Sequence, residues 1–338
     1  MNTRRLGLVA AFVILALVWG SSFLFIKESL TAFTPAQVVL GRVVLGAVTL
    51  LLVMLVSGRK WPREPRFWGH MTVVGLLLCV APFSLFAWAG ESLPSGLSAI
   101  LNAATPLMTA LATAAVLPSE RLRRGQSLGI VVGGAGVVLV IAPSSMAASQ
   151  ALLDTLPAQL ACLGAAACYG LGFAYMRRFI VGRHHYDSIT VATVQLTLAA
   201  AVALLAFPFA ALAAPAGAPL ELSPAAVISL VLLGSLGTGV AYILNTAIVT
   251  RWGAVRASTV TYLTPLVAVL LGVVLLDERL SWNQPVGCLV VITGIIAAHR
   301  SATAHRAARV PEPTTANGPA AADAATIHPA VGAGGSRL

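Results

Sequence analysis

Charged residues are scarce in this sequence. Only 9% of its 338 residues are Asp, Glu, Lys or Arg, whereas 58% are hydrophobic. A typical soluble domain contains about 25% charged residues. A soluble globular protein is therefore excluded, because too few charges remain to cover its surface. Four cysteines in the whole chain do not suit a disulfide scaffold, and the apolar content does not suit a disordered chain. The composition indicates a protein that crosses a membrane several times.

Long stretches of the chain carry no charge at all. A membrane-spanning helix needs about 20 mostly apolar residues, and these stretches do not alternate between apolar and polar as barrel strands do. The sequence therefore predicts an all-α integral membrane protein with ten transmembrane helices. One predicted helix lies in residues 29–58, which are interrupted only by Arg42. The other nine lie in the uncharged runs 6–26, 67–90, 92–119, 125–153, 155–176, 188–220, 222–250, 257–276 and 280–299.

The basic residues gather in alternate loops. Of the 21 Lys and Arg residues, 18 lie on one side of the predicted membrane, and only Lys27 and Arg279 lie on the other. Basic residues stay on the cytoplasmic side, so both termini are expected to be cytoplasmic. The excess of Arg over Lys, 19 to 2, suggests a GC-rich bacterial genome and hence the inner membrane. The positive charge is expected to face anionic membrane lipid, and no continuous basic patch for nucleic acid is present.

The two ends of the chain call for separate interpretations. The first run follows Arg4 and Arg5, as in a signal peptide, but it is longer than the usual h-region and lacks a clear cleavage site. We therefore expect a retained first helix. Residues 300–338 are rich in Ala, Pro, Thr and Gly. They contain too few large apolar residues to fold, which predicts a disordered cytoplasmic tail.

Two segments of the sequence match each other. Residues 105–122 and 264–280 both begin with Thr-Pro-Leu and end with Glu-Arg-Leu. Upstream, Trp19-Gly20 corresponds to Tyr169-Gly170. Helices 1–5 therefore repeat as helices 6–10. Because five is odd, the second copy crosses the membrane in the opposite sense, and inverted repeats are typical of secondary transporters with a midplane substrate site.

These features resemble the EamA type of the drug/metabolite transporter superfamily. The resemblance rests on the order and duplication of Trp19-Gly20-Ser21-Ser22, Lys27, Arg42, Pro106, Glu120-Arg121-Leu122, Pro265 and Glu278-Arg279-Leu280. It implies a ten-helix basket built from one EamA-like five-helix repeat over residues 6–142 and another over residues 156–299. It further implies secondary transport that exports small metabolites, often amino acids or drug-like compounds, without fixing the substrate.

Arg42 is the most informative polar residue. It lies seven residues after Pro35, about 10 Å below the predicted outer surface, where a charge costs roughly 2.5–3.5 kcal/mol. We expect it to face the bundle interior, where it can hold a substrate carboxylate. Trp19 and Asn102 fall at a similar depth and complete the predicted vestibule. Two alternatives stay open. Arg42 bonds to backbone carbonyls or extends outward toward Glu28 or Glu91, and Trp19 serves only helix packing beside Gly20.

The second half supplies further candidates. Tyr169, Asn245 and Tyr262 are candidate substrate-binding residues, although polar residues in membrane helices more often form interhelical hydrogen bonds. Pro106 and Pro265 are matched prolines within predicted helices. A proline removes an intrahelical hydrogen bond and bends a helix, which makes these two candidate gating joints or, alternatively, static kinks.

The remaining charges leave the energy source open. Lys27 and Glu91 form a predicted charged rim at the outer end, and no Asp or Glu lies deep in a predicted helix. Proton exchange and facilitated efflux are both open. Glu120 and Glu278 follow their helices, where they cap a helix or pair with Arg. Within the same superfamily, import of a sugar or organic acid is the main alternative to export, and a non-transporting membrane scaffold is another.

An enzyme is not expected. The segment Gly96-Leu97-Ser98-Ala99 lacks the second glycine of a nucleophile elbow, and no His lies at membrane depth to act as a base. The cysteines show no CxxC spacing, so no cofactor or metal is expected. The glycines of residues 129–133 favour close packing within one chain, which suggests a monomer or a weak homodimer.

Overall fold

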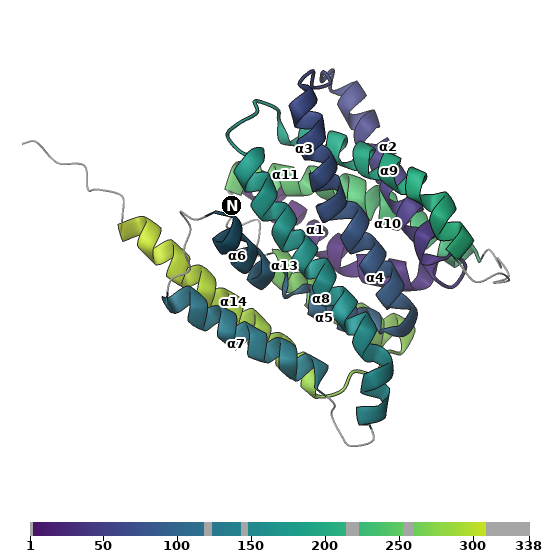
Figure 1. The fold of residues 1–338 in the computed structure, drawn as a ribbon, viewed down its shortest axis with the longest axis vertical. Helices are drawn as coiled ribbons and strands as arrows, with labels where there is room; N and C mark the ends of the chain where they lie inside the picture. The colour runs from purple at the N-terminus through teal and green to yellow at the C-terminus, as the bar shows by residue number, and fades with distance from the viewer. Residues whose placement is uncertain (1–2, 118–123, 143–147, 214–222, 253–259, 309–338) are drawn as a thin grey trace, which may run out of the picture.

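The computed structural model describes residues 3–117, 124–142, 148–213, 223–252 and 260–308, and all regular structure in these ranges is helical (Figure 1). Glu120 lies outside these ranges, as do residues 309–338 of the predicted tail, whereas residues 300–308 belong to the last helix. The α-helices are α1 (Thr3–Ser29), α2 (Pro35–Val56), α3 (Pro65–Gly75), α4 (Ala81–Ser92), α5 (Ser95–Asn102), α6 (Thr105–Val116), α7 (Arg124–Ile141), α8 (Ala148–Phe179), α9 (Ser188–Ala213), α10 (Pro224–Gly234), α11 (Ala241–Trp252), α13 (Val260–Leu276) and α14 (Asn283–Ala308). Two π-helical turns are η1 (Leu76–Val80) and η2 (Ser235–Val240).

Within the described parts of the chain, eight helical stretches are long and apolar enough to span a membrane. Two further apolar stretches, Val260–Leu276 and Asn283–Ala298, are shorter. The eight long stretches are Gly7–Ser29, Pro35–Val56, Pro65–Ser92, Ser95–Val116, Arg124–Ile141, Leu153–Phe179, Ser188–Leu212 and Pro224–Ile248. The chain is therefore an all-helical, multi-pass membrane protein.

The distribution of side chains is that of a protein surrounded by lipid. Large apolar side chains are exposed on the outside of the bundle: Val131 is 67% exposed, Leu205 74% and Phe209 76%. Polar side chains such as Thr193 and Gln195 are buried instead. Soluble monomers rarely expose apolar surface on this scale, so the outer surface is suited to contact with membrane lipid.

Several spans are interrupted near their middle. The π-turn η1 joins α3 to α4 just before Pro82, and η2 joins α10 to α11. The span Ser95–Val116 breaks after Asn102, and α6 begins at Thr105. Pro106 is therefore the second residue of a new helix rather than a kink within a continuous one, whereas Pro265 lies inside α13 as expected. Each interruption leaves backbone N–H or C=O groups without an intrahelical partner. Membrane proteins tolerate such groups only where they are buried in protein or line a water-filled cavity.

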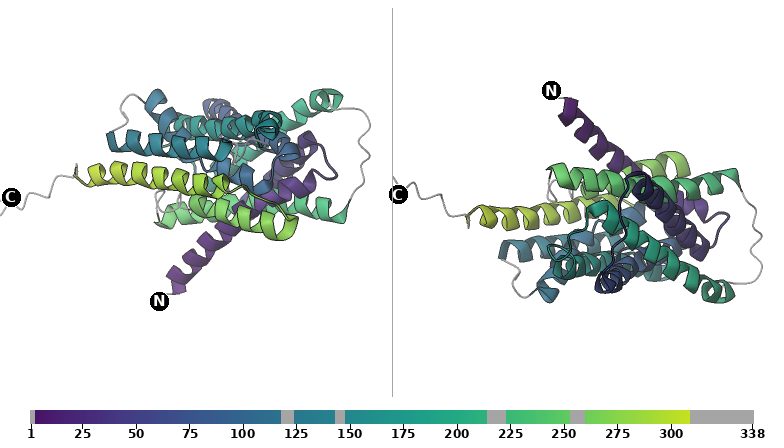
Figure 2. Two further views of the ribbon diagram at one scale, coloured as in Figure 1. Left: turned by 90° about the horizontal axis from the view of Figure 1, so that it is seen from below. Right: turned by 90° about the horizontal axis from the view of Figure 1, so that it is seen from above.

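The helices pack in a recurring pattern. α1 packs against α13, α10 and α11, while α8 packs against α6 and α4; α2 contacts α9. The pair α7 and α14 lies side by side along one edge (Figure 1). Figure 2 shows the first turns of α1 extending away from the other helices.

Glycines bring α7 and α14 into backbone contact. A Cβ atom added to Gly136 would lie 2.6 Å from Val291 N, and one added to Gly287 would lie 2.8 Å from the Gly136 carbonyl oxygen. Asn283 at the start of α14 also donates hydrogen bonds of 2.7 and 3.0 Å to the carbonyls of Ala142 and Leu139. Small residues permit this close approach of helices, so the pair forms one rigid edge of the bundle.

We expect Gly136→Ala to destabilise the protein, because its new methyl group must push the two helices apart. Overpacking of this kind costs about 1–3 kcal/mol. Gly134→Ala is the matched control, since a Cβ atom there has nothing within 4 Å. Thermal unfolding of the detergent-solubilised proteins should show a lower midpoint for Gly136→Ala only. Equal midpoints for both variants would contradict the close contact between α7 and α14.

Candidate functional site

A cavity of about 620 Å³ lies inside the bundle. Each bordering helix presents one face to it. From α1 the lining residues recur at intervals of three and four, namely Trp19, Ser22, Phe23 and Ile26. From α9 they recur in the same way, namely Ser188, Val191, Ala192 and Gln195. This spacing places the side chains of each set on one side of a helix. Among the described residues, α7 and α14 contribute none.

Arg42 from α2 lines the cavity and is only 9% exposed. Its Nε donates a hydrogen bond of 3.1 Å to Thr238 Oγ1, and its guanidinium carbon lies 3.7 Å from the ring centroid of Phe83. A cation over an aromatic face is stabilised by the ring quadrupole. No carboxylate among the described residues pairs with Arg42, and its two terminal nitrogens have no hydrogen-bond partner there.

The π-turn η2 explains how Thr238 reaches Arg42. Thr238 Oγ1 also bonds to the carbonyl of Leu233 five residues earlier, at 3.1 Å. A Cβ atom added to Gly234 would lie 3.1 Å from the Arg42 carbonyl oxygen. The turn thus fits closely against α2 and directs the threonine hydroxyl at the guanidinium. π-Turns inside α-helices often mark functional sites.

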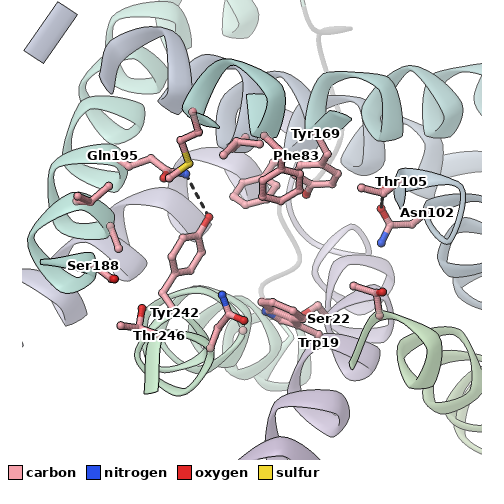
Figure 3. Close-up of a pocket in the computed structure, with 18 of the residues that line it drawn as sticks. Trp19, Ser22, Phe83, Asn102, Thr105, Tyr169, Ser188, Gln195, Tyr242 and Thr246 are labelled. Carbon is pink, nitrogen blue, oxygen red and sulfur yellow. Dashed lines mark hydrogen bonds between the residues drawn. The ribbon is translucent and has the colours of Figure 1, made fainter. Parts of the chain in front are cut away.

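Aromatic rings form the apolar wall next to Arg42. Phe23 and Phe86 meet edge to face with centroids 5.5 Å apart, and Phe86 stacks on Tyr169 at 6.3 Å. Figure 3 shows Phe83 and Tyr169 on one side of the cavity and Trp19 on the other. Offset and edge-to-face contacts of this kind are favourable. The wall offers a flat apolar surface beside a fixed positive charge.

Neutral polar groups lie elsewhere on the lining. Gln195 Nε2 donates to Tyr242 OH at 3.2 Å (Figure 3). It also donates to Cys79 Sγ, at 3.2 Å. Thr105 Oγ1 donates to Asn102 Oδ1 at 3.1 Å. Asn245 also lines the cavity, and its side chain has no hydrogen bond to a described residue. These groups can donate to or accept from a ligand.

The cavity extends to the connection between α8 and α9. His184 and Tyr186 line this end, and both bond to Glu64, at 2.9 and 3.2 Å. Arg59 forms an ion pair with Asp187, and the same Asp187 caps α9 through the backbone N–H of Ile189 at 3.0 Å. Exposed charges surround this end, so we assign it as the mouth of the cavity.

The structure brings together most of the residues that the sequence suggested. The lining contains Trp19, Arg42, Asn102, Tyr169, Asn245 and Pro265. Of the others, Tyr262 packs beside the apolar cluster of Ala103, Leu107, Val291 and Ile295 rather than in the lining. Pro106 is also outside the lining. The two residues of the predicted charged rim differ in their surroundings. Glu91 is exposed. Lys27 Nζ instead donates to the carbonyls of Gly90 and Leu93, at 2.8 and 3.1 Å.

Some site residues were not among the candidates drawn from the sequence. Phe83 and Thr238 hold Arg42, and Tyr242 and Thr246 line the cavity. A signal for three of them exists. Thr238, Tyr242 and Thr246 recur at intervals of four within an uncharged run, which is the spacing of one helix face. Phe83 carries no such signal, because phenylalanine is ordinary in any apolar helix.

Comparison with known proteins identifies the family. The sequence profile of the EamA-like transporter family matches residues 6–142 and 156–299. The chain belongs to the EamA-like transporter family. Its members are transporters rather than enzymes, so this chain is a membrane transporter with a small-molecule substrate.

Individual relatives agree with this assignment. The chain is 25% identical over 300 residues to a probable amino-acid metabolite efflux pump of Escherichia coli (strain K12), covering 87% of this chain and 94% of that protein. It is 23% identical over 279 residues to the transporter YoaV of Bacillus subtilis (strain 168), covering 82% and 92%. A crystal structure of 22% sequence identity superposes with a TM-score of 0.61 over 88% of this chain and 98% of that one, which shows a shared fold.

Two serines on one face of α1 test the extent of the cavity. Ser22 lines the cavity, whereas Ser29, two turns later, is 0% exposed and does not. In a cysteine-free background, we expect Ser22→Cys to react with a small soluble maleimide much faster than Ser29→Cys in detergent-solubilised protein. Mass spectrometry of the labelled protein measures both rates. Equal rates at the two positions would contradict the cavity's position.

Proposed function

We propose that this transporter exports small carboxylate-bearing metabolites, such as amino acids or related drug-like compounds, across a bacterial inner membrane by alternating access. The observation that carries the proposal is the buried guanidinium of Arg42, which borders the cavity without a carboxylate partner among the described residues. An isolated buried charge is costly unless it is paired. A substrate carboxylate supplies that pair through its two oxygens and the terminal nitrogens of Arg42.

The rest of the cavity suits the remainder of such a molecule. The apolar part of the substrate packs on the rings of Trp19, Phe86 and Tyr169. Its hydroxyl or amino groups reach Gln195 and Asn245, which lie on other bordering helices. A volume of about 620 Å³ is in the range of pockets that hold small molecules. The proposal therefore assigns one polar, charged end and one apolar body to the substrate.

The proposed architecture is ten spans in two inverted five-helix repeats, residues 6–142 and 156–299, with Val260–Leu276 and Asn283–Ala298 as the last two spans. Packing supports it, because the main contacts between the two halves have counterparts when the halves are exchanged. α1 of the first half packs on α10 and α13 of the second, as α8 packs on α4 and α6. The π-turns η1 and η2 interrupt the third and eighth proposed spans.

Residues of the site also recur when the two halves are exchanged. Arg42 is the eighth residue of α2, and Gln195 is the eighth residue of α9. Arg42 bonds to Thr238 in η2, and Gln195 bonds to Cys79 in η1. Each residue thus contacts the π-turn of the other half. Exchange between two such similar halves allows a midplane site to open to one side or the other at similar energy.

The basic loops set the proposed orientation. With both termini cytoplasmic, the mouth at His184 and Tyr186 faces the cytoplasm, and the opposite end near Lys27 and Glu278 faces the periplasm. The structure then corresponds to a cytoplasm-open conformation. The transporter acts as a monomer or a weak homodimer, since the close glycine contacts between α7 and α14 are used within one chain.

The transport proposal is tested with Arg42→Ala. Removing one partner of a desolvated charge pair costs about 2–5 kcal/mol, or about 30-fold or more in affinity. We expect export to be lost while the amount of membrane-inserted protein stays near normal. Arg66→Ala is the control, because Arg66 is exposed at the start of α3. The measurement is the extracellular metabolite profile of cells expressing the chain, either variant or an empty vector.

Each outcome bears on the proposal. Accumulation of a carboxylate-bearing compound outside cells with the intact chain and Arg66→Ala, but not with Arg42→Ala, supports export through Arg42. Accumulation that is undiminished in Arg42→Ala removes Arg42 from the site. If labelled carboxylates enter proteoliposomes through the intact chain yet none leaves cells, the direction of transport is import.

A further inference from the structure

A group of three hydrogen bonds joins the two halves at the end of the bundle opposite the mouth. Glu278, on the turn between α13 and α14, accepts hydrogen bonds from the backbone N–H of Ser95 at 2.6 Å and of Gly96 at 3.0 Å. Its Oε2 also accepts from Ser95 Oγ at 3.1 Å. The first N–H groups of a helix lack intrahelical partners and favour an anion. Glu278 therefore caps α5 from a position 183 residues away in sequence.

The turn that carries Glu278 is shaped around this contact. Asp277 adopts φ 51°, a left-handed conformation that non-glycine residues rarely use. The backbone N–H of Glu278 closes the turn onto the carbonyl of Gly272 at 3.0 Å. A Cβ atom at residue 272 would lie 2.9 Å from Ser95 Oγ and would collide with the Glu278 carboxylate. A glycine at residue 272 thus leaves room for the carboxylate over α13.

The positively charged Lys27 holds the end of α4, next to the start of α5 that Glu278 caps. Lys27, near the end of α1, donates to the carbonyls of Gly90 and Leu93 at the end of α4. It also interacts electrostatically with Glu278. The corner between α4 and α5 is therefore held by a cation from the first half and an anion from the second. We call Glu278 with the start of α5 the α5 clasp.

The helix α5 connects this clasp to the cavity. Ser95 at its first residue bonds to Glu278, and Asn102 at its last residue lines the cavity. Eight residues of helix span about 12 Å. The chain is interrupted on both sides of α5, by Leu93 and Pro94 before it and by the break before α6. A short rigid segment between two interruptions can move as a unit.

We propose that the α5 clasp is the latch that keeps the periplasmic end of the cavity closed, and that its release lets α5 swing away and opens the cavity to the periplasm. This proposal takes its orientation and the transport cycle from the proposed function. Opening exposes the Glu278 carboxylate and the N–H groups of α5 to water, which replaces the lost hydrogen bonds. Because the clasp lies at an aqueous end, it can form and break within one cycle. Glu278 is thus a positioning residue that does not touch the substrate.

The test measures access to a cysteine at residue 26. Ile26 lines the cavity and is 5% exposed, so Ile26→Cys in a cysteine-free background reports whether the closed end has opened. A membrane-impermeant thiol reagent is added to either side of the membrane without substrate. We expect Glu278→Ala to speed periplasmic labelling by at least about tenfold, because it removes the acceptor of three hydrogen bonds from the start of α5, and to slow cytoplasmic labelling. Glu278→Gln keeps the shape of the side chain and should give a smaller shift in the same direction.

The control is Glu28→Ala. Glu28 is an acidic residue at the same end of the bundle, and only its backbone carbonyl accepts hydrogen bonds from described residues. It should leave both labelling rates unchanged. Unaltered periplasmic labelling in Glu278→Gln and Glu278→Ala overturns the latch, even if Arg42→Ala abolishes transport. Faster labelling from the opposite side of the membrane keeps the latch but reverses the proposed orientation, and faster periplasmic labelling without any carboxylate export separates the latch from the proposed substrate.

Discussion

The interior of this transporter is organised around one guanidinium that has no carboxylate beside it among the described residues. Arg42 is buried in an apolar bundle, where an unpaired charge is unfavourable. The chain offsets this with an aromatic face from α4 and a hydroxyl from η2. Neither partner neutralises the charge. Arg42 therefore links three segments that are distant in sequence, α2, α4 and η2, and an anion that enters the cavity changes the electrostatics of all three at once.

Much of the fold could be predicted because spanning helices leave a coarse signature. Uncharged runs marked the apolar helices, and the isolated Arg42 within one of them indicated a residue that faces the interior. The finer features have no such signature. A π-turn adds one residue to a turn without a characteristic composition, and the break after Asn102 arises among ordinary small residues. Tyr262 shows the same limit: an apolar run establishes that a helix spans the membrane, but one position of rotation, about 100°, decides whether a side chain meets the cavity or the next helix.

The candidate site was predictable to the same degree. Polar and aromatic residues at membrane depth pointed to Trp19, Arg42 and Asn102, which do border the cavity. The partners of Arg42 were not foreseeable, because Thr238 lies 196 residues away and reaches α2 only through the geometry of η2. Glu278 was recognised as a repeat marker in the sequence, with capping or ion pairing as its expected role. The structure selects capping, and it caps a helix of the other half rather than its own.

The proposed relation between the two halves, in which each contacts the π-turn of the other, also explains why one Arg suffices for the site. Arg42 and Gln195 are each the eighth residue of their helices, α2 and α9, and they bond to residues of the π-turns η2 and η1. A charge at both positions would place two cations around one small cavity, where they would repel each other and favour a dianion. A neutral amide at one of them leaves a site with a positive side and a neutral hydrogen-bonding side. Under the proposed function, a substrate with one carboxylate binds in one orientation, with its apolar body against the aromatic wall. The two proposed repeats then both take part in opening the site while remaining chemically distinct.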